Sequence, residues 1–140
     1  MLSFPFRNIL SAMLIALPAA SFAKPVSFQC LMTSNEGWIA EQIFLEYDSE
    51  SNSSRVADGV ILHFEKKPID AKILEDTDKK LVVSWNVVVQ SRGQTTKMAY
   101  RLAHFRKNGK VIVNAKPHGY SNTFVSRGKC RATKQPFPIG

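Results

Sequence analysis

Residues 81–89 read LVVSWNVVV, and this stretch decides the fold class. β-Branched and aromatic residues fit the half-buried, pleated surface of a strand. The flanking segments, 76–80 and 91–94, are rich in residues that form turns. We therefore expect a strand over Leu81–Gln90, with Trp85 buried at its centre.

Seven further runs rich in Val, Ile, Phe and Tyr lie along the chain, bounded by turn signals. Asn108-Gly109 is the clearest signal, because both residues tolerate the positive φ of a two-residue hairpin turn. No segment of helical length shows an apolar stripe with a 3.6-residue period. The pattern predicts an all-β meander of eight strands, at Pro25–Met32, Trp38–Asp48, Val56–Glu65, Pro68–Glu75, Leu81–Gln90, Thr95–Arg106, Val111–Lys116 and Thr123–Ala132.

Side chains alternate across a strand, so parity assigns each residue to one face. One face of every run is apolar, and both cysteines belong to that face. With an even number of up-and-down strands, the first and last strands run antiparallel and can pair, which removes the exposed edges. We expect a single closed β-barrel, with a β-sandwich of the same strands as the alternative.

Three segments are expected along the chain. Residues 1–23 are typical of a cleaved signal peptide, because Arg7 precedes an apolar core and Ser21-Phe22-Ala23 matches the cleavage pattern. The apolar core is shorter than the roughly 20 residues that span a bilayer. Residues 24–134 are expected to form the barrel domain, and residues 135–140, with two prolines, a flexible tail. These features predict a periplasmic or secreted protein with no transmembrane segment after cleavage.

The chain has two cysteines, Cys30 and Cys130. In an exported protein, such a pair indicates one disulfide. The lack of CxxC or HxxxH spacing argues against a metal site. We expect the bridge to join the first strand to the last, and we expect neither a metal nor a cofactor.

Two short motifs flank the β-rich middle of the chain, Phe28-Gln29-Cys30 and Gly128-Lys129-Cys130. Together with the leader, this layout resembles that of small exported β-proteins of Gram-negative bacteria. It is also similar in plan to the barrel inhibitors of C-type lysozyme, whose first and last strands are tied by a disulfide. Their Ser-Gly-x-x-Tyr loop aligns with no segment of this sequence, so the resemblance implies a fold and not an inhibitory activity.

Histidine would be the first choice for a general base, but His63, His104 and His118 lie in no catalytic motif. We therefore do not expect an enzyme. His104 and Glu41 have inward parity among apolar neighbours, where an isolated charge would be costly. Each is expected either as a polar anchor inside a ligand pocket or as a residue near a strand end that reaches water.

Charge divides the chain into two parts of opposite sign. All eleven acidic residues lie between Glu36 and Asp78, whereas residues 79–140 carry thirteen Lys and Arg residues and no acidic one. Such asymmetry points to an anionic partner. Outward parity on the last three strands predicts one anion-binding face, made of Lys97, Arg101, Lys116, Arg127, Lys129 and Arg131.

Two functions are compatible with these features. The first is a binding module whose basic face holds an anionic lipid, lipopolysaccharide, an acidic polysaccharide or an acidic protein. The aromatic side chains lie mostly on the inner face, which argues against nucleic acid as the partner. The second function is that of a small carrier with an apolar ligand inside the barrel.

Overall fold

The computed structural model describes residue 3 and residues 13–18, 24–33 and 37–138. Most of the expected signal peptide, residues 1–23, lies outside the described residues, as do the last two residues of the expected tail. Among the described residues, no helix is long and apolar enough to cross a membrane.

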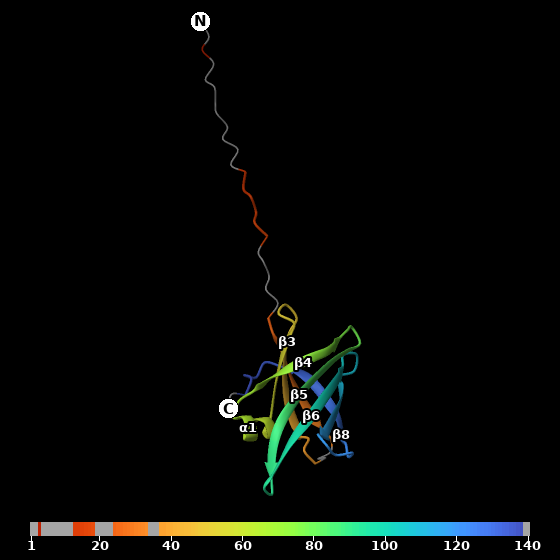
Figure 1. Ribbon diagram of the computed structural model, residues 1–140. Coiled ribbons are helices and arrows are strands. Elements are labelled where there is room, and N and C mark those ends of the chain that lie inside the picture. Colours follow the sequence, from red (N-terminus) through yellow and green to blue (C-terminus); the bar gives the residue numbers. More distant parts are fainter. Residues whose placement is uncertain (1–2, 4–12, 19–23, 34–36, 139–140) are drawn as a thin grey trace.

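Eight antiparallel strands form a closed barrel in which each strand pairs with its neighbours in sequence (Figure 1). The barrel closes because β8 also pairs with β1. This confirms the expected meander and decides for the barrel over the sandwich. The elements are β1 (Val26–Met32), β2 (Gln42–Asp48), β3 (Ser53–Asp58), α1 (Gly59–Glu65), β4 (Ile69–Asp76), β5 (Lys80–Ser91), β6 (Gln94–Phe105), β7 (Lys110–Pro117) and β8 (Phe124–Thr133).

The seam between β1 and β8 is held by a covalent bond and by close backbone packing. Cys30 and Cys130 face each other in the register and form the expected disulfide. A Cβ added to Gly128 would lie 2.0 Å from the carbonyl oxygen of Leu31. At this point β1 and β8 therefore pack too closely for any side chain at position 128.

The expected strand over residues 56–65 is wrong in its second half, because β3 ends at Asp58 and α1 follows. The Asp58 carboxylate caps the helix by accepting a hydrogen bond from the Ile61 N–H at 2.8 Å. Lys66 ends the helix in the left-handed conformation, with a φ of 65°. The helix buries Ile61, which strand parity assigns to the outside. With seven residues, α1 is too short for its apolar spacing to be told apart from strand alternation.

The barrel interior is filled by side chains. Trp85 is 4% exposed, which confirms its expected burial, and its ring stacks on that of Tyr100 with the centroids 5.3 Å apart. Buried aliphatic residues from other strands, such as Leu45, Val56 and Val113, complete the core. At the level of the stacked rings, the protein's own side chains occupy the interior, as is common in barrels of this size.

The connections divide between the two ends of the barrel. One end, called the α1 end, carries the β1–β2 connection, α1, the β5–β6 turn and the β7–β8 connection. The opposite end carries the other three connections, the start of β1 and the end of β8. The α1 end therefore brings together segments that are far apart in the sequence.

The described part of the expected tail, residues 135–138, has no helix or strand but lies against the barrel. The guanidinium carbon of Arg55 on β3 lies 4.8 Å from the centre of the Phe137 ring. The Gln135 N–H donates to the Thr133 hydroxyl at 3.1 Å. These contacts attach the tail to the β3 and β8 sides of the barrel.

Removing the disulfide should lower the free energy of unfolding. The two cysteines are 100 residues apart in the sequence, and loss of a native disulfide from a small secreted domain typically costs about 2 to 5 kcal/mol. We expect this loss for the double variant Cys30→Ala/Cys130→Ala in equilibrium urea unfolding. Alkylation of the native, unreduced protein should label no thiol, and labelling of both cysteines would contradict the bridge.

Gly128→Ala should also destabilise the barrel, because the new methyl group would collide with the Leu31 backbone. Overpacking of this kind typically costs about 1 to 3 kcal/mol, which urea unfolding would measure. Gly59→Ala is the matched control, since a Cβ there meets nothing within 4 Å and Ala is favoured over Gly in a helix. Equal losses from the two variants would argue against the close seam.

Candidate functional site

The six cations of the predicted face lie on the outward side of three consecutive strands, and all are exposed. They come from β6 (Lys97, Arg101), β7 (Lys116) and β8 (Arg127, Lys129, Arg131). Ala99 of β6 pairs with Lys116 of β7, so a small side chain lies beside this cation. The cations are therefore distributed over one continuous sheet surface.

The described acidic residues leave most of this surface unpaired. The salt bridges join Arg55 to Glu46, Lys80 to Glu75, and Arg106 to Asp76. Arg131 donates from its Nη2 to the Oε1 of Gln29 at 3.1 Å. Within the described parts of the chain, the other five cations of the face have no carboxylate within 4.0 Å.

A depression of about 720 Å³, called here the cationic groove, lies on the outer surface where β7, β8 and β1 meet. Its apolar lining residues are Leu31, Phe105, Val111, Ile112 and Gly128. Its polar lining residues are Thr33, Asn108, Lys110, Arg127 and Lys129. Because Leu31 is 48% exposed, aliphatic surface in the groove is open to water.

Lys110 is a groove residue that the sequence analysis missed. It faces Lys129 directly in the β7–β8 register, and like charges in this position repel each other. Within the part of the chain that the structure describes, no acidic residue lines the groove to compensate. The signal was present, because Lys110 shares its parity with Lys116, but the strand was expected to begin one residue later, at Val111.

The groove includes only part of the predicted face. Arg127 and Lys129 line it. Lys97 and Lys116 lie near the α1 end, close to the start of β6 and the end of β7. Arg131 lies along the seam, with its side chain on Gln29. The structure therefore places two of the six predicted cations, Arg127 and Lys129, in the groove, where they lie beside Ile112 and Leu31.

Glu41 and His104, which parity places inside the barrel, differ in the structure. Glu41 is exposed, because β2 begins only at Gln42 and residue 41 belongs to the β1–β2 connection. It is therefore not inside the barrel, and it fits the alternative expectation of a residue near a strand end that reaches water. His104 is 6% exposed, and its ring centroid lies 4.9 Å from that of Phe28. Burial, and to a lesser extent the Arg106 charge, lowers the pKa of His104. His104 is therefore a neutral core residue at pH 7.

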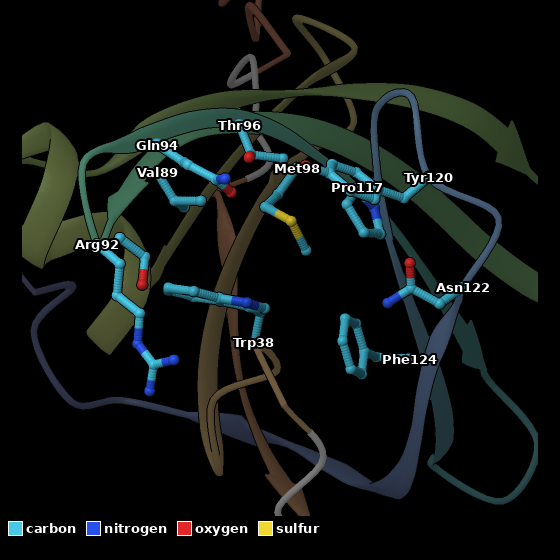
Figure 2. A pocket seen from close by; sticks show the side chains of 11 residues that line it. Trp38, Val89, Arg92, Gln94, Thr96, Met98, Pro117, Tyr120, Asn122 and Phe124 are labelled. Carbon is cyan, nitrogen blue, oxygen red and sulfur yellow. The ribbon is translucent and has the colours of Figure 1, made fainter.

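A second hollow, of about 440 Å³, opens at the α1 end and is called the mouth pocket (Figure 2). Its apolar lining residues are Trp38, Val89, Met98, Pro117 and Phe124. Its polar lining residues are Ser91, Arg92, Gln94, Thr96, Tyr120 and Asn122. Three separate connections of the barrel contribute side chains to it.

Contacts with the core and with α1 hold the aromatic walls of the mouth pocket. The Tyr100 hydroxyl donates to the Trp38 carbonyl oxygen at 2.9 Å. The Trp38 ring also contacts Phe64 of α1, with the centroids 6.2 Å apart. Gly37, with a φ of 54°, packs so closely on Phe124 that a Cβ there would lie 2.5 Å from the ring. The walls are therefore positioned by the fold before any ligand binds.

A buried carboxylate lies in the same part of the core. Asp58 is 3% exposed, and desolvation raises its pKa to about 6, although hydrogen bonds from the Ile61 and Val60 backbone oppose the shift. Burial, and then the Asp58 charge, raises the pKa of Tyr100. The Tyr100 hydroxyl therefore keeps its proton at neutral pH and can donate it to the Trp38 carbonyl.

The side chains that line the cationic groove and the mouth pocket are apolar, cationic or neutral polar groups, which are suited to binding a ligand. Among the described residues, no three His, Cys, Asp or Glu side chains gather where they could hold a metal ion. No protein-family model, curated protein or solved structure matches this chain. A function is therefore inferred from the side chains of the two hollows.

Asp58→Asn should make the stability of the protein less dependent on pH. A carboxyl group whose folded pKa is raised stabilises the fold below its unfolded pKa, and this contribution is lost as the pH rises through the folded pKa. For Asp58 the window runs from 3.8 to about 6, and two pKa units correspond to about 3 kcal/mol. As the pH is raised from below this window to above it, the wild type loses this contribution and Asp58→Asn does not. We therefore expect the free energy of unfolding of Asp58→Asn to rise by up to that amount relative to that of the wild type.

Urea unfolding at the two pH values measures this gain. Asp78→Asn, which removes an exposed carboxylate, is the control and should follow the wild type. A stability difference between Asp58→Asn and wild type that is the same at both pH values would contradict the prediction.

Proposed function

We propose that the protein is an exported binding module that docks on an anionic phospholipid surface through the outward faces of β6, β7 and β8. The cationic groove is the observation that carries the proposal, because its apolar residues lie beside three cations. A bilayer presents phosphates above an apolar layer. A protein surface with exposed cations and exposed aliphatic groups matches this layered chemistry.

The strand register places cationic side chains next to aliphatic ones. Arg127 pairs with Ile112 across β7 and β8, and Lys129 pairs with Leu31 across the β1–β8 seam. The cationic groups can bind phosphate oxygens while the aliphatic side chains enter the boundary of the acyl layer. The repulsion between Lys129 and Lys110 would also be relieved by a phosphate placed between them.

The exposed aliphatic surface favours a lipid over an acidic polysaccharide. Removing apolar surface from water contributes about 25 cal/mol per Å². A hydrated polysaccharide offers little apolar surface against which Leu31 could be buried, whereas the acyl boundary of a bilayer does. The groove therefore has a feature that binding to a polar polyanion would not use.

The distribution of charge around the barrel supports an oriented contact. All eleven acidic residues precede residue 79, and the strands follow one another around the barrel. The described acidic residues therefore lie on β2, β3, β4, α1 and the connections that flank them, and none of them lines the groove. An anionic surface would attract one side of the barrel and repel the other.

Two features support an envelope location as part of the proposal. Residues 1–23 have the composition of a signal peptide. The Cys30–Cys130 disulfide is typical of proteins in oxidising compartments. In such a compartment the protein would meet membrane surfaces directly.

Sedimentation with vesicles tests the proposal. The wild type should bind phosphatidylglycerol-containing vesicles, not pure phosphatidylcholine vesicles, and binding should weaken with salt because charges are screened over about 10 Å at 0.1 M. The triple variant Lys110→Gln/Arg127→Gln/Lys129→Gln should lose about a hundredfold in affinity, at about 1 kcal/mol for each cation. The control Lys66→Gln/Lys67→Gln/Lys72→Gln removes the same charge from the acidic side and should bind nearly as wild type.

Leu31→Ser separates lipid binding from simple attraction to a polyanion. It should weaken vesicle binding several-fold, because less apolar surface is buried, and leave binding to soluble heparin unchanged. Equal losses from the two triple variants would show that net charge alone is responsible. Binding to heparin but not to anionic vesicles would overturn the lipid proposal.

A further inference from the structure

The mouth pocket contains a pair of aromatic rings with a gap between them. In Figure 2 the Trp38 and Phe124 rings lie on either side of an opening, and Met98 lies above and between them. Arg92 is at the Trp38 side of the opening, and Asn122 is at the Phe124 side. A flat apolar group that entered this gap would contact both rings and the methionine sulfur, all of which interact favourably with aromatic ligands.

Arg92 occupies a backbone position that does not favour arginine. It has a φ of 51° and is followed by Gly93 with a φ of 75°, so both residues of the β5–β6 turn are left-handed. Asn or Gly at position 92 would adopt this conformation with less strain. Strain of this kind is often found where a side chain serves a function, and here the side chain lines the mouth pocket.

The charge of the mouth pocket favours an anionic ligand. Among the described residues, Arg92 is the only Lys or Arg that lines the mouth pocket, and none of the lining residues is acidic. Among the described residues, Arg92 forms no salt bridge, so its guanidinium group is available. The planar guanidinium fork binds a carboxylate through two parallel hydrogen bonds.

We infer that the mouth pocket binds a small aromatic carboxylate, with the ring between Trp38 and Phe124 and the carboxylate on Arg92. The volume of about 440 Å³ lies within the range of small-molecule sites. Phe64 contacts the Trp38 ring, Gly37 packs on the Phe124 ring, and the Tyr100 hydroxyl holds the Trp38 backbone, so little conformational freedom is lost on binding. This site shares no lining residue with the cationic groove.

Titration calorimetry with matched ligands tests the inference. The probes are 2-naphthoate, the neutral 2-naphthamide and acetate, which has the carboxylate without the ring. We expect 2-naphthoate to bind at least about tenfold more tightly than 2-naphthamide, the effect of one charged hydrogen bond. Acetate should show no measurable binding.

Arg92→Gly separates the role of the side chain from that of the fold. The variant should bind 2-naphthoate and 2-naphthamide equally weakly, and its thermal stability should not fall, because Gly accepts the turn conformation without strain. Lys97→Gln, which removes an exposed cation outside the pocket, is the matched control and should keep the preference for the carboxylate. Phe124→Leu should weaken both naphthyl ligands.

Three outcomes would overturn the inference. They are equal affinity of the wild type for the two naphthyl ligands, wild-type affinity in Arg92→Gly, and an equal loss of affinity in Lys97→Gln. Vesicle binding of Arg92→Gly should remain as in the wild type, so this test and the membrane test can fail independently.

Discussion

The pairing of β1 with β8 is the constraint on which the rest of the structure depends. If the first strand did not pair with the last, both edges of the sheet would be exposed and the apolar face would be open to water. The Cys30–Cys130 disulfide joins these two strands, and the other six lie between the cysteines in sequence. Gly128 allows the two backbones to approach, because any side chain there would meet Leu31. The bridge and the glycine thus act at the same seam.

The cationic groove is a consequence of this seam. Leu31 and Thr33 come from β1 and the residue after it, whereas Arg127 and Lys129 come from β8. These residues are about a hundred positions apart in the sequence, and the β1–β8 register makes them neighbours. The β1 side of the groove, with Leu31 beside Lys129, therefore exists only in the closed barrel. The mouth pocket depends on the core instead, since Tyr100 stacks on Trp85 and also holds the Trp38 backbone.

Much of the fold could be predicted because its signals are local. Strand alternation predicted the eight strands and the burial of Trp85, and the two cysteines predicted their bridge. The helix was missed because a cap by Asp58 overrode an apolar pattern that also fits a strand. Strand parity also predicted that the six cations of the anion-binding face are exposed. It did not predict that Arg127 and Lys129 share a groove with Leu31, because this depends on a pairing between distant strands.

The sequence by itself determined the all-β meander, the possible disulfide and the separation of acidic from basic residues, since each is carried by residue type and spacing along the chain. Only the tertiary structure decided that the sheet closes into a barrel, because closure depends on how strands twist and on whether β1 can reach β8. It also decided where hollows form. Lys110 and Leu31 meet in one groove, and Trp38 and Arg92 meet at one mouth, through long-range register that no local pattern encodes.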